Sequence, residues 1–117
     1  MHQFKELEIW KRSRFFCSEI YQVTSSFQSD EKFGLTNQLR RAAVSIPSNI
    51  AEGSSRNSNK DFSRFLEIAI GSAYEIETQI LIASDLGFIT PPESENLTSE
   101  LAEIIKMISR FRSTLKI

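Results

Sequence analysis

Apolar residues recur at alternating intervals of four and three residues along most of this chain, and this spacing is what most constrains its fold. In the C-terminal segment the spacing runs through Leu97, Leu101, Ile104, Ile108, Phe111 and Leu115. On a helix, these six side chains form a single stripe. No segment sustains the alternation of apolar and polar residues that is typical of a half-buried strand. The sequence therefore predicts an all-α protein.

The same spacing, together with signals at helix ends, predicts helices at about residues 4–27, 34–54, 58–86 and 91–115. Before the last of these, Thr90-Pro91-Pro92-Glu93 is typical of a capping box with proline in the first turn. The segments between the helices are short, which favours antiparallel neighbours. We therefore predict a single domain over residues 1–117, folded as an antiparallel up-down-up-down four-helix bundle.

Pro47 interrupts the second predicted helix without interrupting its apolar spacing, in the stretch LRRAAVSIPSNIAEG. A proline inside a helix costs about 3 kcal/mol, because it removes a backbone hydrogen bond and clashes with the preceding turn. The Ala43 carbonyl loses its usual donor. We expect Ser45 or Asn49 to satisfy backbone or cross-helix groups around this point, because buried polar groups need partners.

Three of the predicted helices carry more apolar residues than one core requires. On the first helix we assign six residues to the core, namely Leu7, Trp10, Cys17, Ile20, Tyr21 and Phe27. The remaining apolar residues, expected to point outward, are Phe15, Phe16, Val44, Pro47, Ala51, Ile68, Leu81 and Ile82, and Tyr74 with them. Scattered exposed apolar side chains on a monomer are one explanation. The fourth helix lacks this excess, which favours a contiguous second surface. We therefore predict a homo-oligomer whose interface contains these eight residues, without Tyr74.

Residues that commonly carry catalysis are few and isolated. His2 is the only histidine and lies at a terminus expected to be mobile. Cys17 is the only cysteine, and on an inward stripe it acts as a small apolar residue. Glu75 and Glu77 are two residues apart and so cannot share a helical face. We predict no catalytic, cofactor-binding or metal site and no enzymatic activity.

Basic residues are the remaining chemical feature. Arg40 and Arg41 are expected on the outward face of the second helix, and Arg56, Lys60 and Arg64 follow the turn to the third. Such sets can hold phosphates, although they also solubilise helices or pair with acidic neighbours. Residues 1–60 carry nine Lys/Arg and six Asp/Glu, and residues 61–117 carry five and nine. Because the net charge of the whole chain is −1, a basic patch can cover only part of the surface.

The segment LTNQLRRAAVSIPSNIAEGSSR, with the later Phe-x-x-Phe-Leu-x-Ile-Ala-x-Gly-Ser and YEIETQI, resembles the 23S rRNA intervening-sequence proteins. These are small bacterial four-helix-bundle proteins, often named putative ribosomal proteins. FKELEIW and ASDLGF extend the resemblance over nearly the whole chain. It implies a homo-oligomer, in known relatives a pentamer, and no enzymatic activity. Relatives are encoded within insertions in rRNA genes, and a related accessory protein of diversity-generating retroelements binds nucleic acid and a reverse transcriptase.

The residues and the resemblance together predict a non-catalytic oligomeric bundle. We expect it to bind structured RNA or a ribonucleoprotein through Arg40, Arg41, Arg56, Lys60 and Arg64. The alternative is a protein–protein interaction scaffold that binds no nucleic acid. The start MHQFKELEIWKR lacks the apolar core of a signal peptide, and no apolar run could span a bilayer. We therefore expect a cytoplasmic location, no membrane partner and no small-molecule substrate.

Overall fold

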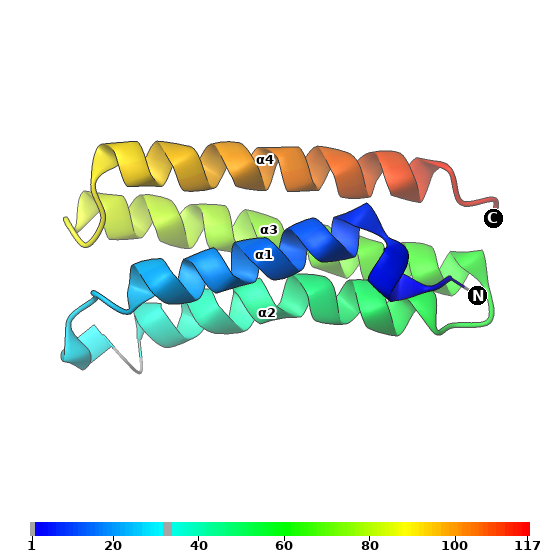
Figure 1. Cartoon of the computed structure of the whole chain (residues 1–117), viewed down its shortest axis with the longest axis horizontal. Coiled ribbons are helices and arrows are strands. Elements are labelled where there is room, and N and C mark those ends of the chain that lie inside the picture. The colour runs from blue at the N-terminus through cyan, green and yellow to red at the C-terminus, as the bar shows by residue number, and fades with distance from the viewer. Residues whose placement is uncertain (1, 32–33) are drawn as a thin grey trace.

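Helices that run alternately up and down lie side by side in the computed structural model, which describes residues 2–31 and 34–117 (Figure 1). The elements in order are η1 (Phe4–Glu6), α1 (Glu8–Thr24), η2 (Ser29–Glu31), α2 (Leu35–Ser54), α3 (Asn59–Asp85) and α4 (Pro91–Ser113). The bundle measures 44 × 24 × 20 Å. Each helix packs against the one before and the one after it, and α1 also packs against α4. The predicted all-α, up-down-up-down four-helix bundle is confirmed.

Helix ends follow the predicted capping signals except at the first helix. Ser58 accepts a hydrogen bond from the Asp61 amide at the start of α3, and Thr90 and Glu93 form the predicted capping box at α4. The prediction of one helix over 4–27 is wrong, because Leu7 is extended and separates η1 from α1, which ends at Thr24. Leu7 packs against the core at this break.

The core stripes of α3 and α4 match the predicted spacing. Their buried members are Phe62, Leu66, Ala69, Ala73, Ile76, Ile80 and Ala83 on α3, and Leu97, Leu101, Ile104 and Ile108 on α4. Phe111 and Leu115 are partly buried against this core. Continuous apolar spacing on these two helices therefore located the core correctly.

The predicted orientation of α1 is correct at Ile20, which is buried, but needs correction at two other residues. Phe16, expected outward, is 0% exposed, while Tyr21, expected inward, is 42% exposed. The buried stripe runs through Ile9, Ser13, Phe16, Ile20 and Thr24. Two of its members are polar, and each bonds its own helix, Ser13 to the Trp10 carbonyl and Thr24 to the Ile20 carbonyl. These locally satisfied hydroxyls can be buried at little cost, so apolar spacing alone did not reveal the stripe.

Helix α2 continues through Pro47, and polar side chains bond around it as expected. The Asn49 amide donates to the Ser45 carbonyl at 2.8 Å and to the Ser45 hydroxyl at 2.9 Å. The Ser45 hydroxyl also lies 2.8 Å from the Ser72 hydroxyl of α3. Both predicted residues therefore contribute, although Asn49 bonds the carbonyl of Ser45 and not that of Ala43.

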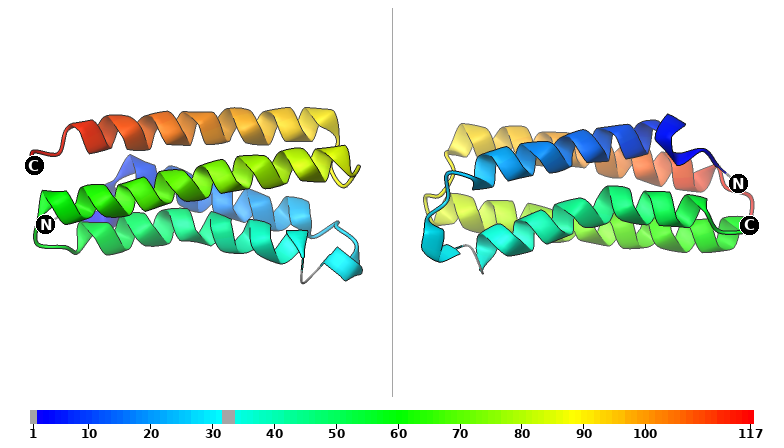
Figure 2. Two further views of the ribbon diagram at one scale, coloured as in Figure 1. Left: turned by 180° about the vertical axis from the view of Figure 1, so that it is seen from behind. Right: turned by 60° about the horizontal axis from the view of Figure 1, so that its bottom comes forward.

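Both termini lie at the same end of the bundle as the α2–α3 turn (Figures 1 and 2). The His2 ring packs 5.0 Å from the Phe62 ring and 5.7 Å from the Phe111 ring. Aromatic packing thus places the His2 ring against α3 and α4. Within the described residues, no helix has the length and apolarity needed to cross a bilayer.

Candidate nucleic-acid interface

The two halves of the bundle carry opposite charge. When each helix is divided at its midpoint, the half that holds both termini contains 11 Lys/Arg and six Asp/Glu among the described residues. The other half contains two Lys/Arg and nine Asp/Glu. The half that holds both termini consists of residues 2–16, 45–72 and 103–117. The other half consists of residues 17–31, 34–44 and 73–102. We call the outer part of the first half, formed by the termini and the α2–α3 turn, the basic end.

Antiparallel packing creates the basic end by bringing distant segments together. The Asn59 amide donates to the Lys116 carbonyl at 3.1 Å, joining the start of α3 to the residues after α4. The C-terminal segment thereby adds its last basic residues, Arg110, Arg112 and Lys116, to those of the α2–α3 turn. No Asp or Glu follows Glu103 in the sequence. The excess of basic residues after Glu103 could have identified this segment from the sequence. Counting charge over the whole of residues 61–117 hid that excess, because the acidic residues before Glu103 outweigh it.

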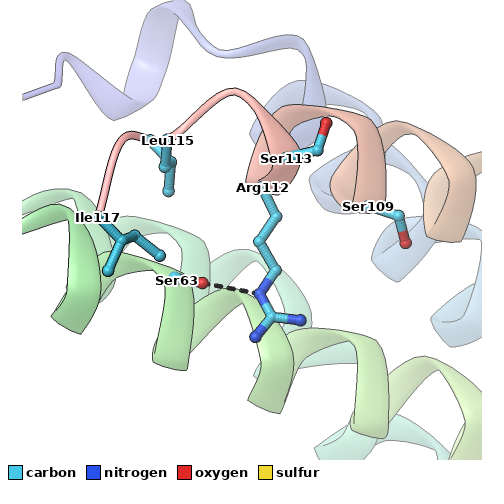
Figure 3. A pocket seen from close by; sticks show the side chains of 6 residues that line it. All are labelled: Ser63, Ser109, Arg112, Ser113, Leu115 and Ile117. Atoms are coloured by element: carbon cyan, nitrogen blue, oxygen red, sulfur yellow. Dashed lines mark hydrogen bonds between the residues drawn. The ribbon is translucent and has the colours of Figure 1, made fainter.

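A hollow of about 410 Å³ lies between α3 and α4 near this end (Figure 3). It is lined by Ser63, Ser109, Arg112, Ser113, Leu115 and Ile117. Arg112 Nε donates to the Ser63 hydroxyl at 2.8 Å, and its Nη2 pairs with Glu67 at 2.7 Å. Hydroxyl and guanidinium donors can bind phosphate oxygens. One side of the Arg112 guanidinium is already paired with Glu67, so fewer of its donors are available to a phosphate.

Arg56 and Arg64 lie at the basic end as predicted and flank the same aromatic ring. Their guanidinium carbons lie 4.8 and 5.9 Å from the Phe65 ring centre. Arg56 pairs with Glu52 at 2.8 Å, while Arg64 lies 3.9 Å from Asp61. These ion pairs are exposed and so contribute little to stability. Phosphates can therefore compete for both guanidinium groups at small cost.

Arg40 occupies a structural position between α1 and α2. Its Nε donates to the Thr24 hydroxyl at 2.8 Å, and its Nη2 to the Tyr21 carbonyl at 3.3 Å. Its guanidinium also lies 4.6 Å from the Tyr21 ring centre. The prediction of an outward Arg40 is therefore wrong, since these contacts hold the side chain against α1.

Arg41 is exposed as predicted but does not join the basic end. It lies 13 residues before Ser54, where α2 ends, a rise of about 20 Å. It lines a polar hollow of about 330 Å³ between α2 and α3, together with Gln38, Ser72 and Glu75. The five predicted residues thus divide into Arg56, Lys60 and Arg64 at the basic end, and Arg40 and Arg41 in the acidic half.

The Arg40→Ala variant should lose about 1–2 kcal/mol of unfolding free energy, because it removes a charge-assisted hydrogen bond and a cation–π contact. The adjacent Arg41→Ala should change it by less than about 0.5 kcal/mol, as expected of an exposed side chain. Urea unfolding of the two variants measures the difference. Equal effects would contradict the structural role of Arg40.

Glu19 of α1 and Glu100 of α4 form a carboxyl pair across the seam between these helices. Burial, a hydrogen bond from Glu19 to Glu100 and the negative charge of Glu100 raise the pKa of Glu19 from its ordinary 4.5 to about 7. The positive charge of Arg12 acts in the opposite direction. Glu19 Oε1 is buried without a hydrogen-bond partner. The folded chain therefore retains a proton near neutral pH that the unfolded chain releases.

This raised pKa gives stability a definite pH dependence. The contribution of protonated Glu19 is complete below about pH 4.5 and is lost as the pH rises to about 7. Glu19→Gln keeps the neutral form, so above pH 7 it should be more stable than the wild type by about 1 kcal/mol, a figure reduced for partial solvation. Thermal unfolding from pH 4 to 8 measures the gap. Ser18→Ala, an exposed neighbour, serves as control, and a gap independent of pH would contradict the prediction.

Metal-ligating side chains do not gather in the part of the chain that the structure describes. No group of three or more His, Cys, Asp or Glu side chains there is arranged to hold a metal ion. Burial raises the pKa of the Cys17 thiol, which favours its protonated form. The basic end is therefore the feature that most resembles a binding site.

Comparison with known proteins identifies the family. The family model of the 23S rRNA-intervening sequence proteins matches residues 5–110. Among solved structures, a protein of unknown function from the S23 ribosomal protein family of Bacteroides thetaiotaomicron VPI-5482 is similar, with a TM-score of 0.84 and 26% identity. The match covers 91% of this chain and 96% of that one. No curated protein matches significantly. The chain therefore belongs to the 23S rRNA-intervening sequence protein family.

Proposed function

We propose that this protein is a non-catalytic, oligomeric RNA-binding bundle of the cytoplasm that holds structured RNA or a ribonucleoprotein at its basic end. One observation carries the proposal: basic residues gather at one end of the bundle while acidic residues dominate the other half. A phosphate backbone is attracted to the first and repelled by the second. The charge separation therefore provides both affinity and orientation, which the net charge of −1 conceals.

The proposed contact residues come from three segments at the basic end. They are Arg56 from the α2–α3 turn, Lys60 and Arg64 from α3, and Arg110 and Lys116 from α4 and the residues after it. All five side chains are exposed. Lysine and arginine contacts to phosphate fix position but do not read bases. The basic end therefore favours recognition of an RNA backbone by its shape.

The family supports this assignment. Its name refers to sequences inserted in 23S rRNA, and the similar structure from Bacteroides belongs to a family named for a ribosomal protein. The family name and the name of the Bacteroides protein describe those proteins and are not observations on this chain. They make RNA the first ligand to test for this chain.

Assembly into a homo-oligomer, a pentamer as the resemblance implies, would strengthen such binding. Large apolar side chains remain exposed on the monomer, among them Tyr74 at 56% and Ile68 at 48%. An assembly that covers part of this surface would also repeat the basic end around an axis. Several weak phosphate contacts on one RNA then act together, which raises the apparent affinity.

Charge reversal at Lys60 should weaken RNA binding much more than the same change at Arg41. Lys60→Glu places a negative charge at the basic end, so the Kd for a structured RNA should rise about tenfold at low salt. Arg41→Glu makes the same change of charge on the acidic half and should alter the Kd less than about twofold. Titration at two salt concentrations measures both effects, and Arg110→Glu should match Lys60→Glu.

The outcome separates the two functional hypotheses. Salt-sensitive binding that weakens in Lys60→Glu but not in Arg41→Glu supports RNA recognition at the basic end. Absence of binding to any structured RNA at low salt would reject RNA recognition and leave the protein-interaction scaffold. Equal weakening in the two variants would show that the basic end is not where RNA binds.

A further inference from the structure

A second hollow at the basic end, which we call the N-terminal hollow, lies between the start of the chain and the end of α2. It is lined by residues 2–5 on one side and by Ala51, Ser54 and Ser55 on the other. Its volume is about 420 Å³, within the range of about 300–1,000 Å³ that is typical of ligand sites. Arg56, the first of the proposed phosphate contacts, directly follows Ser55. RNA held at the basic end is therefore close to this hollow.

Aromatic rings distinguish the N-terminal hollow from the hollow beside Arg112. The rings of His2 and Phe4 belong to its lining. The hollow beside Arg112 is lined instead by serine, arginine, leucine and isoleucine side chains. The flat face of a nucleobase stacks on aromatic side chains, whereas a phosphate group offers no such face. The N-terminal hollow therefore favours a base over a phosphate.

Both rings are packed against other aromatic residues of the bundle. The centre of the Phe4 ring lies 5.2 Å from that of the Trp10 ring, in an edge-to-face arrangement. The His2 ring lies against Phe62 and Phe111. A side chain that is already held in place loses little conformational entropy when a ligand binds to it. The two rings thus form a preorganised surface for stacking.

Polar and charged groups around the rings match the other parts of a nucleotide. The exposed Lys5 ammonium lies 6.0 Å from the centre of the Phe4 ring, so a cation that can pair with phosphate stands beside the aromatic surface. The Ser55 hydroxyl donates to the Glu52 carbonyl at 2.6 Å, and its oxygen can still accept a hydrogen bond from the edge of a base. The Gln3 amide can both donate and accept. The hollow therefore offers partners for the face of a base, for its edge and for its phosphate.

We propose that the N-terminal hollow receives one unpaired base of the RNA, while the basic end holds the phosphates on either side of it. This inference rests on the proposed RNA binding and names the class of RNA, which is one with a bulge or loop instead of a continuous duplex. Bases inside a continuous helix are stacked on their neighbours and cannot enter the hollow. An unpaired base can be splayed out and stacked on a protein side chain. The hollow thus adds recognition of a single nucleotide to the contacts with the backbone.

Three hairpin RNAs that differ at one position test the inference. One has a single unpaired adenosine in its stem, one has an abasic nucleotide at the same place, and one has a fully paired stem. In titrations at low salt, the wild type should bind the adenosine bulge about tenfold more tightly than the paired hairpin, as expected from stacking of one base. The abasic bulge keeps the flexibility of the RNA but lacks the base. It should therefore bind like the paired hairpin.

Two uncharged substitutions in the lining test whether the N-terminal hollow is the source of this preference. Ala51→Leu fills the hollow, and Phe4→Leu removes a ring but keeps an apolar side chain. Each should bring the Kd values of the adenosine bulge and the paired hairpin to within about twofold of each other. Ala102→Leu, the same change at an exposed alanine of the acidic half, is the matched control and should retain the preference. Lys60→Glu should weaken binding of all three hairpins by the same factor, because it acts on the backbone contacts.

Competition by adenosine monophosphate separates a base within RNA from a free nucleotide. The free nucleotide lacks the contacts that the rest of the RNA makes with the basic end, so it should bind at least about a hundredfold more weakly than the bulged hairpin. Displacement of the hairpin by adenosine monophosphate at a concentration near the Kd of the hairpin would assign the hollow to free nucleotides and overturn the inference.

The other outcomes distinguish failure of the inference from failure of the proposed function. Equal binding of the three hairpins, still weakened by Lys60→Glu, would overturn the base site and leave RNA recognition at the basic end. An abasic bulge that binds as tightly as the adenosine bulge would overturn the base site too, because flexibility of the RNA would then explain the preference. A preference that persists in Ala51→Leu and Phe4→Leu would place the base outside the N-terminal hollow, contrary to the inference. Absence of binding to all three hairpins at low salt would overturn the proposed function and the inference together.

Discussion

Phe16→Ala should lower the free energy of unfolding by about 3–5 kcal/mol, whereas Phe15→Ala should change it by less than about 0.5 kcal/mol. Phe16 is 0% exposed and lies in the core, so its truncation removes buried area and leaves a cavity. Phe15 is 61% exposed. Urea unfolding of the two variants measures the difference between adjacent residues of the same type.

This pair tests the rotation of α1, the largest difference between the predicted and the observed core. Each variant should be measured at two protein concentrations, because an effect of assembly depends on concentration whereas an effect within one bundle does not. A loss in Phe15→Ala equal to that in Phe16→Ala, independent of concentration, would contradict the buried stripe through Ile9, Phe16 and Ile20.

Gly53→Ala should lower the free energy of unfolding by about 1–3 kcal/mol, although alanine is the better helix former. A Cβ atom at this position would lie 2.7 Å from Phe65 Cβ and 2.9 Å from the Phe62 ring. Both neighbours belong to α3 and cannot move apart without shifting that helix. Thermal unfolding should therefore show a lower Tm.

Gly71 provides the matched control for Gly53. It lies inside α3, and a Cβ atom there would have no heavy atom within 4 Å. Gly71→Ala should therefore raise the free energy of unfolding by about 0.5–1 kcal/mol through helix propensity alone. The opposite signs at two helical glycines are the decisive result. Stabilisation in Gly53→Ala would mean that α2 and α3 are further apart at this point than the structure shows.

Gly53 also connects the stability of the fold to its basic end. The glycine lets α2 approach α3 just before the turn that carries Arg56, and this turn leads directly to Lys60 and Arg64. A side chain at position 53 would push the two helices apart where these basic residues gather. The glycine at the end of the SIPSNIAEG segment therefore has a packing role that also positions the proposed RNA contacts.

Most of the fold could be predicted from the sequence because helical signals are local. The capping box of Thr90 and Glu93 and the apolar spacing of α3 and α4 depend on residues three or four apart. The orientation of α1 could not be predicted in this way, because Ser13 and Thr24 take core positions. Their hydroxyls donate hydrogen bonds to carbonyls of the preceding turn, so these polar residues can be buried. A search for regularly spaced apolar residues passes over them.

The candidate site was only half predictable. Arg56, Lys60 and Arg64 are close in sequence and remain close in space, so their grouping could be foreseen. Arg40 was misjudged because its partner, Thr24, lies on another helix. The basic residues of α4 were missed because they follow the α2–α3 turn by some 50 residues, the separation of Ser63 from Arg112.

The sequence by itself determined the four helices, the ends of the last three and the antiparallel order, because hydrogen bonds within a helix, caps and short connections act over a few residues. Only the tertiary structure decided which faces point inward and which charges meet. Packing brings together side chains from different helices, and their partners cannot be inferred from spacing along one of them. The basic end, the N-terminal hollow and the structural role of Arg40 all arise at this level.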